Sequence, residues 1–323
     1  YFVSGVRPEQ FVPLAVVHRS GIDESVHFGA CVGLASDGSI AFSFGDPHIQ
    51  IFPRSSTKPL QALAMVRAGL QLPAEKLALV CSSHNGEDVH QNMVLEILAE
   101  FGLSESDLGN TPDHPMHTGS AHAAIRDGKP KSALQMGCSG KHSGMLATCV
   151  INGWPTTGYL AETHPLQQAI TAAIADVTGK DAVAIGVDGC GAPAHVIELV
   201  GMARAMHAMA IGTAGDSGLR ISEAMSQFPF MVGGTGRDVT IIVSAVPGLF
   251  AKDGADAVYV AGMADGRAVA LKLSDGSGRG TPTVLLAALR KLGIDVSAVP
   301  ESIVEVVYGH GKRVGEVRAI GFD

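Results

Sequence analysis

Residues with high β-propensity near the start of the chain predict strands. Residues 14–18, 26–35 and 39–44 are rich in such side chains. Asp37-Gly38 separates the last two segments, and this dipeptide between two strands is a strong hairpin signal. The beginning of the chain is therefore expected to form antiparallel strands.

The same pattern returns towards the end of the chain. Residues 257–262 and 267–273 flank Asp265-Gly266, which predicts a second hairpin. Residues 281–292 then predict a helix, and residues 314–320 predict a last strand.

The middle of the chain has helical patterns instead. Residues 59–68 follow Ser and Thr, begin with Pro and end at Gly69, which are start and stop signals of a helix. Apolar residues recur at helical spacing between positions 93 and 101, and residues 165–178 and 195–210 also predict helices.

These elements predict the α+β class, in which a mixed, mainly antiparallel sheet from both termini is flanked by helices. Because no Pro/Ser-rich linker interrupts the sequence, we expect one domain over residues 1–323.

Composition narrows the possible functions. Apolar residues make up 46% of the 323 residues, which is enough for a large core. The formal net charge is -8 and the basic residues are scattered, so nucleic-acid binding is not expected. Apolar stretches stop well short of the roughly 20 residues that a membrane span needs. The first ten residues lack a secretory pattern, and the odd number of five cysteines argues against a disulfide framework, so we expect a cytoplasmic protein.

Residues 54–59 read Arg-Ser-Ser-Thr-Lys-Pro and place a Ser-x-x-Lys pattern at the start of a predicted helix. Residues three apart on a helical turn share a face, so the Lys58 ammonium group is expected to reach the Ser55 hydroxyl. A serine needs a base to become a nucleophile, and a buried lysine can serve as that base. Taken alone, the pattern is equally typical of a helix cap followed by a solvated lysine.

Two further segments combine small and polar residues. Residues 80–87 follow an apolar helix end, so their turn could place Ser83 in a cleft, although a simple connection between helices with Ser and Asn caps is about as well supported. Residues 136–144 include Cys138 and Lys141 between glycines. They predict a tight loop rather than a strand or a helix start, or else a helix-entry loop with one buried thiol.

Residues 182–187 predict a buried strand that ends in Asp-Gly-Cys-Gly, with Pro193 starting a helix. Alternation along the strand would place Asp188 and Cys190 on one side. A structural corner with a buried cysteine is the alternative. Later in the chain, Lys252 follows an apolar segment and precedes Asp253-Gly254, so it could point into a cleft or flank a surface hairpin.

Together, these segments resemble the signature blocks of the rhizobial-type L-asparaginase family, in order and over nearly the whole chain. The blocks are residues 54–59, Cys-Ser-Ser-His at 81–84, Cys-Ser-Gly-Lys-His at 138–142 and Asp-Gly-Cys-Gly-Ala-Pro at 188–193. The family is related neither to the bacterial type I and II asparaginases nor to the Ntn-hydrolase ones. The resemblance implies a fold similar to serine β-lactamases and glutaminases, and a homodimer.

The resemblance also implies roles for individual residues. Ser55 would pair with Lys58, and Ser83 with Lys252. The substrate-binding residues would be Arg54, His84 and Asp188, and the zinc ligands would be Cys138, Lys141 and Cys190.

The expected reaction is hydrolysis of the side-chain amide of L-asparagine to L-aspartate and ammonia by a serine nucleophile with a lysine base. Either Ser55 or Ser83 could attack, and the short spacing to Lys58 favours Ser55. Two thiolates weaken zinc as a Lewis acid, so zinc is expected to assist substrate binding rather than catalysis.

Asp238 stands where some relatives are expected to have a cysteine. His114, His117 and His122 are interpreted as loop histidines without a site role.

Two other functions stay open at this point. One keeps the serine and lysine chemistry with glutamine or another amide as substrate, because one methylene changes binding by only roughly 1–3 kcal/mol. The other is a zinc-containing protein that binds an amino acid without hydrolysing it.

Overall fold

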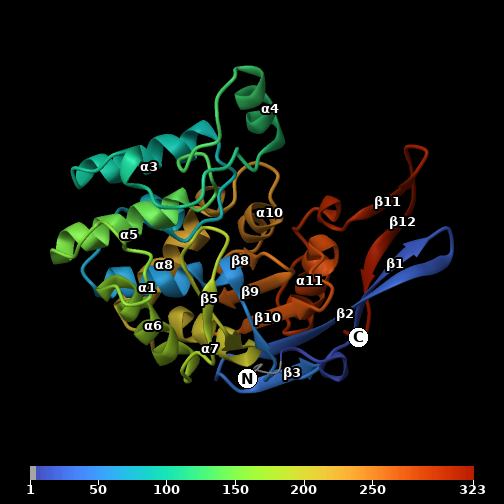
Figure 1. Ribbon diagram of the computed structural model, residues 1–323. Coiled ribbons are helices and arrows are strands. Elements are labelled where there is room, and N and C mark those ends of the chain that lie inside the picture. The colour runs from blue at the N-terminus through green and yellow to red at the C-terminus, as the bar shows by residue number, and fades with distance from the viewer. Residues whose placement is uncertain (1–4) are drawn as a thin grey trace.

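An eight-stranded antiparallel sheet lies at the centre of the structure, a computed structural model that describes residues 5–323 (Figure 1). Its strands follow the order β11-β12-β1-β2-β10-β9-β8, and β3 also pairs with β2. The strands are Val12–Arg19 (β1), Ile22–Leu34 (β2), Ile40–Phe44 (β3), Leu249–Gly254 (β8), Val258–Met263 (β9), Ala268–Leu273 (β10), Val306–Gly309 (β11) and Lys312–Ala319 (β12).

Both ends of the chain contribute to this sheet, as the hydrophobic pattern predicts. Strand β1 pairs with β2 on one side and with β12 on the other, where Ala15 lies opposite Ala319. Strand β2 then pairs with β10, which joins the first hairpin to the last part of the chain. The α+β class with a sheet built from both termini is therefore confirmed.

Helices form the rest of the molecule and gather mainly beside the β8 end of the sheet (Figure 1). Helix α7 packs on β9, β10 and β2, and α11 packs on β10 and β12. The helices are Lys58–Arg67 (α1), Ala74–Val80 (α2), Asp88–Glu100 (α3), Thr118–Arg126 (α4), Ser139–Asn152 (α5), Pro165–Thr178 (α6), Leu199–Ala210 (α7), Asp216–Gln227 (α8), Pro229–Val232 (α9), Asp238–Ala245 (α10) and Thr281–Lys291 (α11), with 3-10 helices at Pro8–Gln10 (η1), Arg54–Thr57 (η2), Glu105–Asp107 (η3), Gly278–Gly280 (η4) and Glu301–Ile303 (η5).

Two short strand pairs correct the prediction for residues 182–210. Gln50–Ile51 (β4) pairs with Ile197–Glu198 (β7), and Ile185–Val187 (β5) pairs with Pro193–His195 (β6). Pro193 therefore starts a strand and not a helix, and α7 begins only at Leu199. The strand expected to be buried is half-exposed, and Val187 is 82% exposed. A short apolar run is compatible with several environments, and here it forms a small hairpin at the surface.

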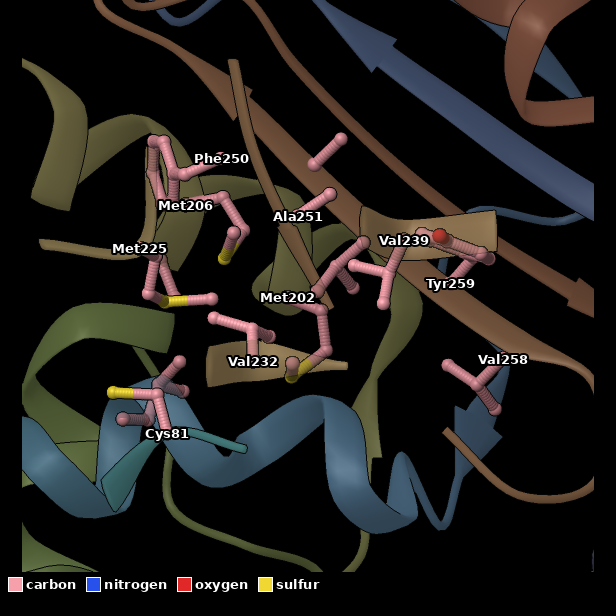
Figure 2. Close-up of a cluster of buried hydrophobic side chains, with 14 of the residues drawn as sticks. Cys81, Met202, Met206, Met225, Val232, Val239, Phe250, Ala251, Val258 and Tyr259 are labelled. Carbon is pink, nitrogen blue, oxygen red and sulfur yellow. The ribbon is translucent and has the colours of Figure 1, made fainter. Parts of the chain in front are cut away.

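The hydrophobic core runs through most of the chain, from Phe11 to Val317. Figure 2 shows one part of it, where Met202 and Met206 of α7 lie among side chains that include Phe250 and Tyr259. Methionine is unbranched and fills irregular gaps between a helix and a sheet well. Cys81, which precedes the polar turn, is buried in the same region. Within residues 5–323 the structure has no helix long and apolar enough to cross a bilayer.

Candidate active site

A cavity of about 300 Å³ collects most of the residues that the sequence singles out. Its walls come from η2, the turn after α2, the segment before α5, the β5–β6 hairpin and the end of β8. The lining residues are Arg54, Ser55, Ser83, Asp113, His114, Met116, Met136, Gly137, Cys138, Asp188, Gly189, Cys190, Asp253, Gly254 and Ala255.

Lys58 joins three of these segments. It is the first residue of α1 and is 1% exposed. Its Nζ donates to the Ser82 carbonyl oxygen at 2.5 Å and to Ser83 Oγ at 3.0 Å, and it lies 3.2 Å from Cys138 Sγ. The lysine beside Ser55 in sequence therefore contacts the other serine.

The expected contact between Lys58 and Ser55 is absent, since within residues 5–323 the structure has no hydrogen bond between their side chains. The segment before Lys58 is a 3-10 turn in which Arg54 has φ +54°, and the long lysine side chain turns towards the residues after α2. Spacing along a turn shows which contacts are possible, and burial against a distant segment selects among them.

Backbone contacts hold the turn that carries Ser83. The Ser83 N–H donates to the Val232 carbonyl at 3.1 Å, and the Asn85 N–H donates to the Gly233 carbonyl at 2.8 Å. Between them, the His84 N–H donates to the Gly137 carbonyl at 3.1 Å. The turn is thus fixed on both flanks, which gives the Ser83 hydroxyl a defined place in the cavity wall.

His84 is fully buried and lies outside the cavity lining. The Gly86 N–H donates to Nδ1 at 3.0 Å, so Nε2 carries the proton and donates to Ser139 Oγ at 2.9 Å. Ser139 in turn donates to the Leu134 carbonyl. Burial lowers the pKa of His84 well below its usual range, so the ring is neutral. Its observed contacts are those of a buried structural residue rather than a substrate ligand.

Cys138, Lys141 and Cys190 converge on one side of the cavity. Cys138 and Cys190 pack in one small buried cluster with Ala192, and Lys141 Nζ lies 3.1 Å from Cys190 Sγ. A hydrogen bond from Cys190 lowers the pKa of the Cys138 thiol well below its usual range, and Lys58 and Lys141 add to this effect against the opposing effect of burial.

These three residues are a suitable donor set for zinc, which accepts thiolate and nitrogen ligands. The lysine must lose its proton to become a ligand. Burial acts to lower the pKa of Lys141, but the neighbouring Cys190 and Cys138 thiols more than offset this effect, so the pKa is raised. Residues 5–323 contain no group of three or more His, Cys, Asp or Glu side chains that could hold a metal ion, so any site here depends on the amine.

The tight loop predicted at residues 136–144 is wrong for its second half, and the alternative, a helix entry with the buried Cys138 thiol, is the arrangement found. Helix α5 begins at Ser139 and includes Gly140 and Gly144. A Cβ atom at Gly140 would lie 2.4 Å from the Leu79 carbonyl oxygen, so this glycine allows α5 to approach α2 closely. The expected close backbone approach is present, but it joins two helices.

Arg54 and Asp188 form the opposite wall. Arg54 Nε donates to Asp188 Oδ1 at 2.8 Å, and its guanidinium group also pairs with Asp256. Burial acts to raise the pKa of Asp188, but Arg54 and the Gly189 N–H lower it below its usual value. Asp188 is therefore an ionised carboxylate at the cavity. It lies in the tight turn between β5 and β6, where its N–H donates to the Ala192 carbonyl, and this turn brings Asp188 and Cys190 to the same cavity.

Lys252 is fully buried within β8. Its Nζ donates to the Asp253 carbonyl oxygen at 2.7 Å and to Asp253 Oδ1 at 2.5 Å. Within the described residues no hydrogen bond joins it to Ser83, so the expected Ser83–Lys252 contact is absent too. Burial lowers the pKa of Lys252 to about 8, although the Asp253 carboxylate opposes that effect.

Three residues at or beside the cavity were not assigned to the site by sequence reasoning. Arg237 Nη2 pairs with Asp253 Oδ2 at 2.5 Å, and Arg237 Nη1 donates to the Ser83 carbonyl at 3.1 Å. Two sequence patterns could have pointed to Arg237 and Asp253. Arg237 ends the Gly-Gly-Thr-Gly-Arg run at 233–237, and Asp253 lies in the Lys-Asp-Gly run at 252–254. His114 was expected to have no site role, yet it lines the cavity and its Nδ1 is buried without a hydrogen-bond partner.

Comparison with known proteins adds a family match. A family model described as L-asparaginase II matches residues 15–319. No protein among those with curated descriptions matches this chain.

Solved structures with similar folds include two described as β-lactamases. A β-lactamase from Mycobacterium bovis has 16% sequence identity and a TM-score of 0.45, covering 82% of this chain and 94% of its own. A putative β-lactamase from Bacteroides dorei DSM 17855 has 12% identity and a TM-score of 0.43, covering 76% of this chain and 84% of its own.

Proposed function

Since this chain belongs to the L-asparaginase II family, we propose that it hydrolyses the side-chain amide of L-asparagine to L-aspartate and ammonia. The observation that supports this most strongly is the buried Lys58 amine, 3.0 Å from the hydroxyl of Ser83, which lines the cavity. This is the distance expected between a nucleophile and its general base.

The first step begins with a neutral Lys58 amine. The amine takes the proton of Ser83 Oγ while this oxygen attacks the side-chain carbonyl carbon of asparagine. The geometry favours Ser83 as the nucleophile because it has a lysine partner, whereas no hydrogen bond from the Ser55 side chain is found within residues 5–323. Ser55, favoured by sequence spacing, is the second candidate and lines the same cavity.

The tetrahedral intermediate needs donors for its oxyanion. Ser55 and Ala255 line the cavity, and their backbone N–H groups have no acceptor within the described part of the chain. We assign them as oxyanion donors. The Lys58 ammonium then protonates the leaving amide nitrogen, and the C–N bond breaks to release ammonia. Lys58 next takes a proton from a water molecule, whose oxygen attacks the carbonyl carbon of the aspartyl ester. The bond between this carbon and Ser83 Oγ breaks, Lys58 returns the proton to Ser83 Oγ, and aspartate is released.

The charged ends of the amino acid need partners as well. We propose that Asp188 receives the α-ammonium group, because it is ionised, and that Arg54 orients Asp188 through the 2.8 Å contact. Zinc held by Cys138, Lys141 and Cys190 would anchor the α-carboxylate or, in place of the contact with Asp188, the neutral α-amino group. This role predicts an effect on KM more than on kcat.

We also propose a homodimer and a cytoplasmic location. Exposed apolar side chains support the dimer: Phe52 is 46% exposed beside the β5–β6 hairpin, whose Val187 is 82% exposed. Light scattering that gives the mass of one chain would contradict the proposed dimer.

The five cysteines are free and buried, which suits a reducing compartment such as the cytoplasm. Fractionation of the native cell would test the cytoplasmic location.

Ammonia release from L-asparagine and L-glutamine tests the proposed function. The wild type is expected to act on L-asparagine, Ser83→Ala is expected to lose at least about 10³-fold in kcat, and Cys138→Ala is expected to raise KM and lose bound zinc. Loss of activity in Ser55→Ala alone would make Ser55 the nucleophile.

Turnover of glutamine alone would make the protein a glutaminase. No turnover of either amide by folded protein that carries zinc and binds asparagine would favour an amino-acid binding protein.

A further inference from the structure

The carboxylate of Asp253 lies between two cations and has no free oxygen. Oδ1 accepts from Lys252 Nζ at 2.5 Å, and Oδ2 accepts from Arg237 Nη2 at 2.5 Å. Although Asp253 belongs to the cavity wall, both of its oxygens are occupied, so it is poorly suited to receive a substrate ammonium group. Its contacts indicate that it acts on Lys252 and Arg237.

Arg237 connects this carboxylate to the turn that carries Ser83. Its Nη2 contacts Asp253 and its Nη1 donates to the Ser83 carbonyl oxygen at 3.1 Å. The planar guanidinium group can make both contacts at once, which one lysine ammonium cannot do with the same geometry. A continuous chain of contacts therefore runs from Lys252 through Asp253 and Arg237 to the Ser83 backbone.

These contacts lie in a largely buried region. Lys252 is 0% exposed, and the side chains of Arg237 and Asp253 are 19% and 22% exposed. Interactions between charges are stronger and less screened in such a place than at the surface. The Gly254 backbone, next in sequence, packs so tightly that a Cβ there would lie 2.4 Å from the Pro53 carbonyl oxygen, which fixes β8 against η2.

From this geometry, and resting on the function proposed above, we propose that Arg237 and Asp253 are positioning residues: Asp253 holds Lys252 as an ammonium ion, and Arg237, paired with Asp253, fixes the Ser83 turn against β8. Lys252 then serves as a fixed positive charge beside the cavity, while Lys58 serves as the base for Ser83. This assignment differs from a Ser83–Lys252 base pair.

The charges around Lys252 set the expected response to pH. The charged groups are Asp253 on its own strand, Lys58 on α1, Arg237 just before α10 and Asp238 on α10, and the Cys81 thiol after α2 is a neutral titratable neighbour because burial raises its pKa. Asp253 is the only carboxylate among them in direct contact with the Lys252 ammonium group in the described structure. Removing its charge should therefore let Lys252 lose its proton at lower pH.

The Asp253→Asn variant tests this directly, because it keeps the size of the side chain and removes its charge. The alkaline limb of its kcat profile is expected to move to lower pH by about one unit or more. Because Asp253→Asn leaves buried cations unpaired and can destabilise the protein, Arg237→Lys is the second variant and keeps both charges. It is expected to lose about 10²-fold in kcat with KM within a few-fold of wild type.

The double variant separates positioning from general damage. If the two residues act together, it should lose no more kcat than the worse single variant. The matched control is Arg267→Lys with Asp265→Asn, an ion pair of 2.6 Å beside the hairpin between β9 and β10, outside the cavity lining. The control is expected to keep the wild-type pH profile, and melting temperatures confirm that each variant is folded.

A titration of ¹³C-labelled lysine followed by NMR tests the protonation of Lys252 without any need for activity, with Lys252→Arg to identify the signal. The proposal expects the Lys252 signal to titrate at lower pH in Asp253→Asn than in the wild type. An unchanged titration, or a kcat profile whose acidic limb moves instead, would overturn it. A wild type that releases no ammonia would contradict the proposed function alone, and the NMR result would still decide whether Asp253 keeps Lys252 charged.

Discussion

At the scale of single residues, burial decides the protonation of side chains that look ordinary in the sequence. His195 is 2% exposed, and its Nε2 donates to Thr171 Oγ1 at 2.8 Å because the Thr171 hydroxyl already donates to the Gln167 carbonyl. Its Nδ1 is buried without a partner, so a second proton would find no acceptor. Burial accordingly lowers the pKa of His195 to about 4.

His195 is therefore expected to make the protein sensitive to acid. An unfolded histidine has a pKa near 6.5, so its contribution to the free energy of unfolding is fully present above that pH and is lost as the pH falls towards 4. The loss is about 3 kcal/mol. Urea unfolding between pH 7 and pH 4 should show a smaller decrease in His195→Asn than in the wild type. The exposed His122→Asn serves as control, and equal decreases in all three proteins would contradict the explanation.

At the scale of elements, contacts between helices rather than a loop place Cys138 and Lys141 beside the cavity. Helix α5 begins one residue after Cys138, and its Gly140 lies against the last turn of α2. Gly144 repeats this one turn later, where an added Cβ would lie 2.8 Å from the Val80 side chain. The close approach of α2 and α5 brings Cys138 next to Lys58 and the Ser83 turn.

Gly140→Ala is expected to destabilise the protein even though alanine favours helices more than glycine. The methyl group would lie 2.4 Å from the Leu79 carbonyl oxygen, which belongs to the backbone and cannot rotate away. Overpacking of this kind costs about 1–3 kcal/mol. Chemical denaturation measures the change, and Gly278→Ala, where nothing lies within 4 Å of the added atom, should change little. Equal stability of both variants would show that the two helices can separate freely.

At the scale of the whole molecule, the sheet connects the two ends of the chain. Strand β12 pairs with β1 along residues 15–19. In this pairing Val17 lies opposite Val317, and both residues are fully buried. The contact is close, because a Cβ at Gly315 would lie 1.8 Å from the His18 carbonyl oxygen. Strand β12 thus contributes Val317 to the core.

Deletion of residues 305–323 should therefore abolish cooperative unfolding. It would remove β11 and β12, expose the edge of β1 and open the core around Val17. Thermal unfolding followed by circular dichroism is the measurement, with the intact chain as reference. A truncated protein with an unchanged sharp transition would mean that the rest of the sheet is stable without its last strands.

The sequence by itself determined the elements and the inventory of reactive groups. Strands at both ends, helices between them and the Asp-Gly hairpins follow from local propensity and periodicity, which act over a few residues. The signature blocks also named several residues that line the cavity, since Ser55, Ser83, Cys138 and Asp188 meet there.

Only the tertiary structure decided which of these residues contact one another. Lys58 could reach Ser55 or Ser83 by length alone, and its burial against the turn after α2 selects Ser83. Lys252 pairs with Asp253 because both lie at the end of β8, and Arg237 reaches them from a segment that no local pattern places nearby. Long side chains such as those of lysine and arginine can reach many partners, and the packing of distant segments decides which partner each of them contacts.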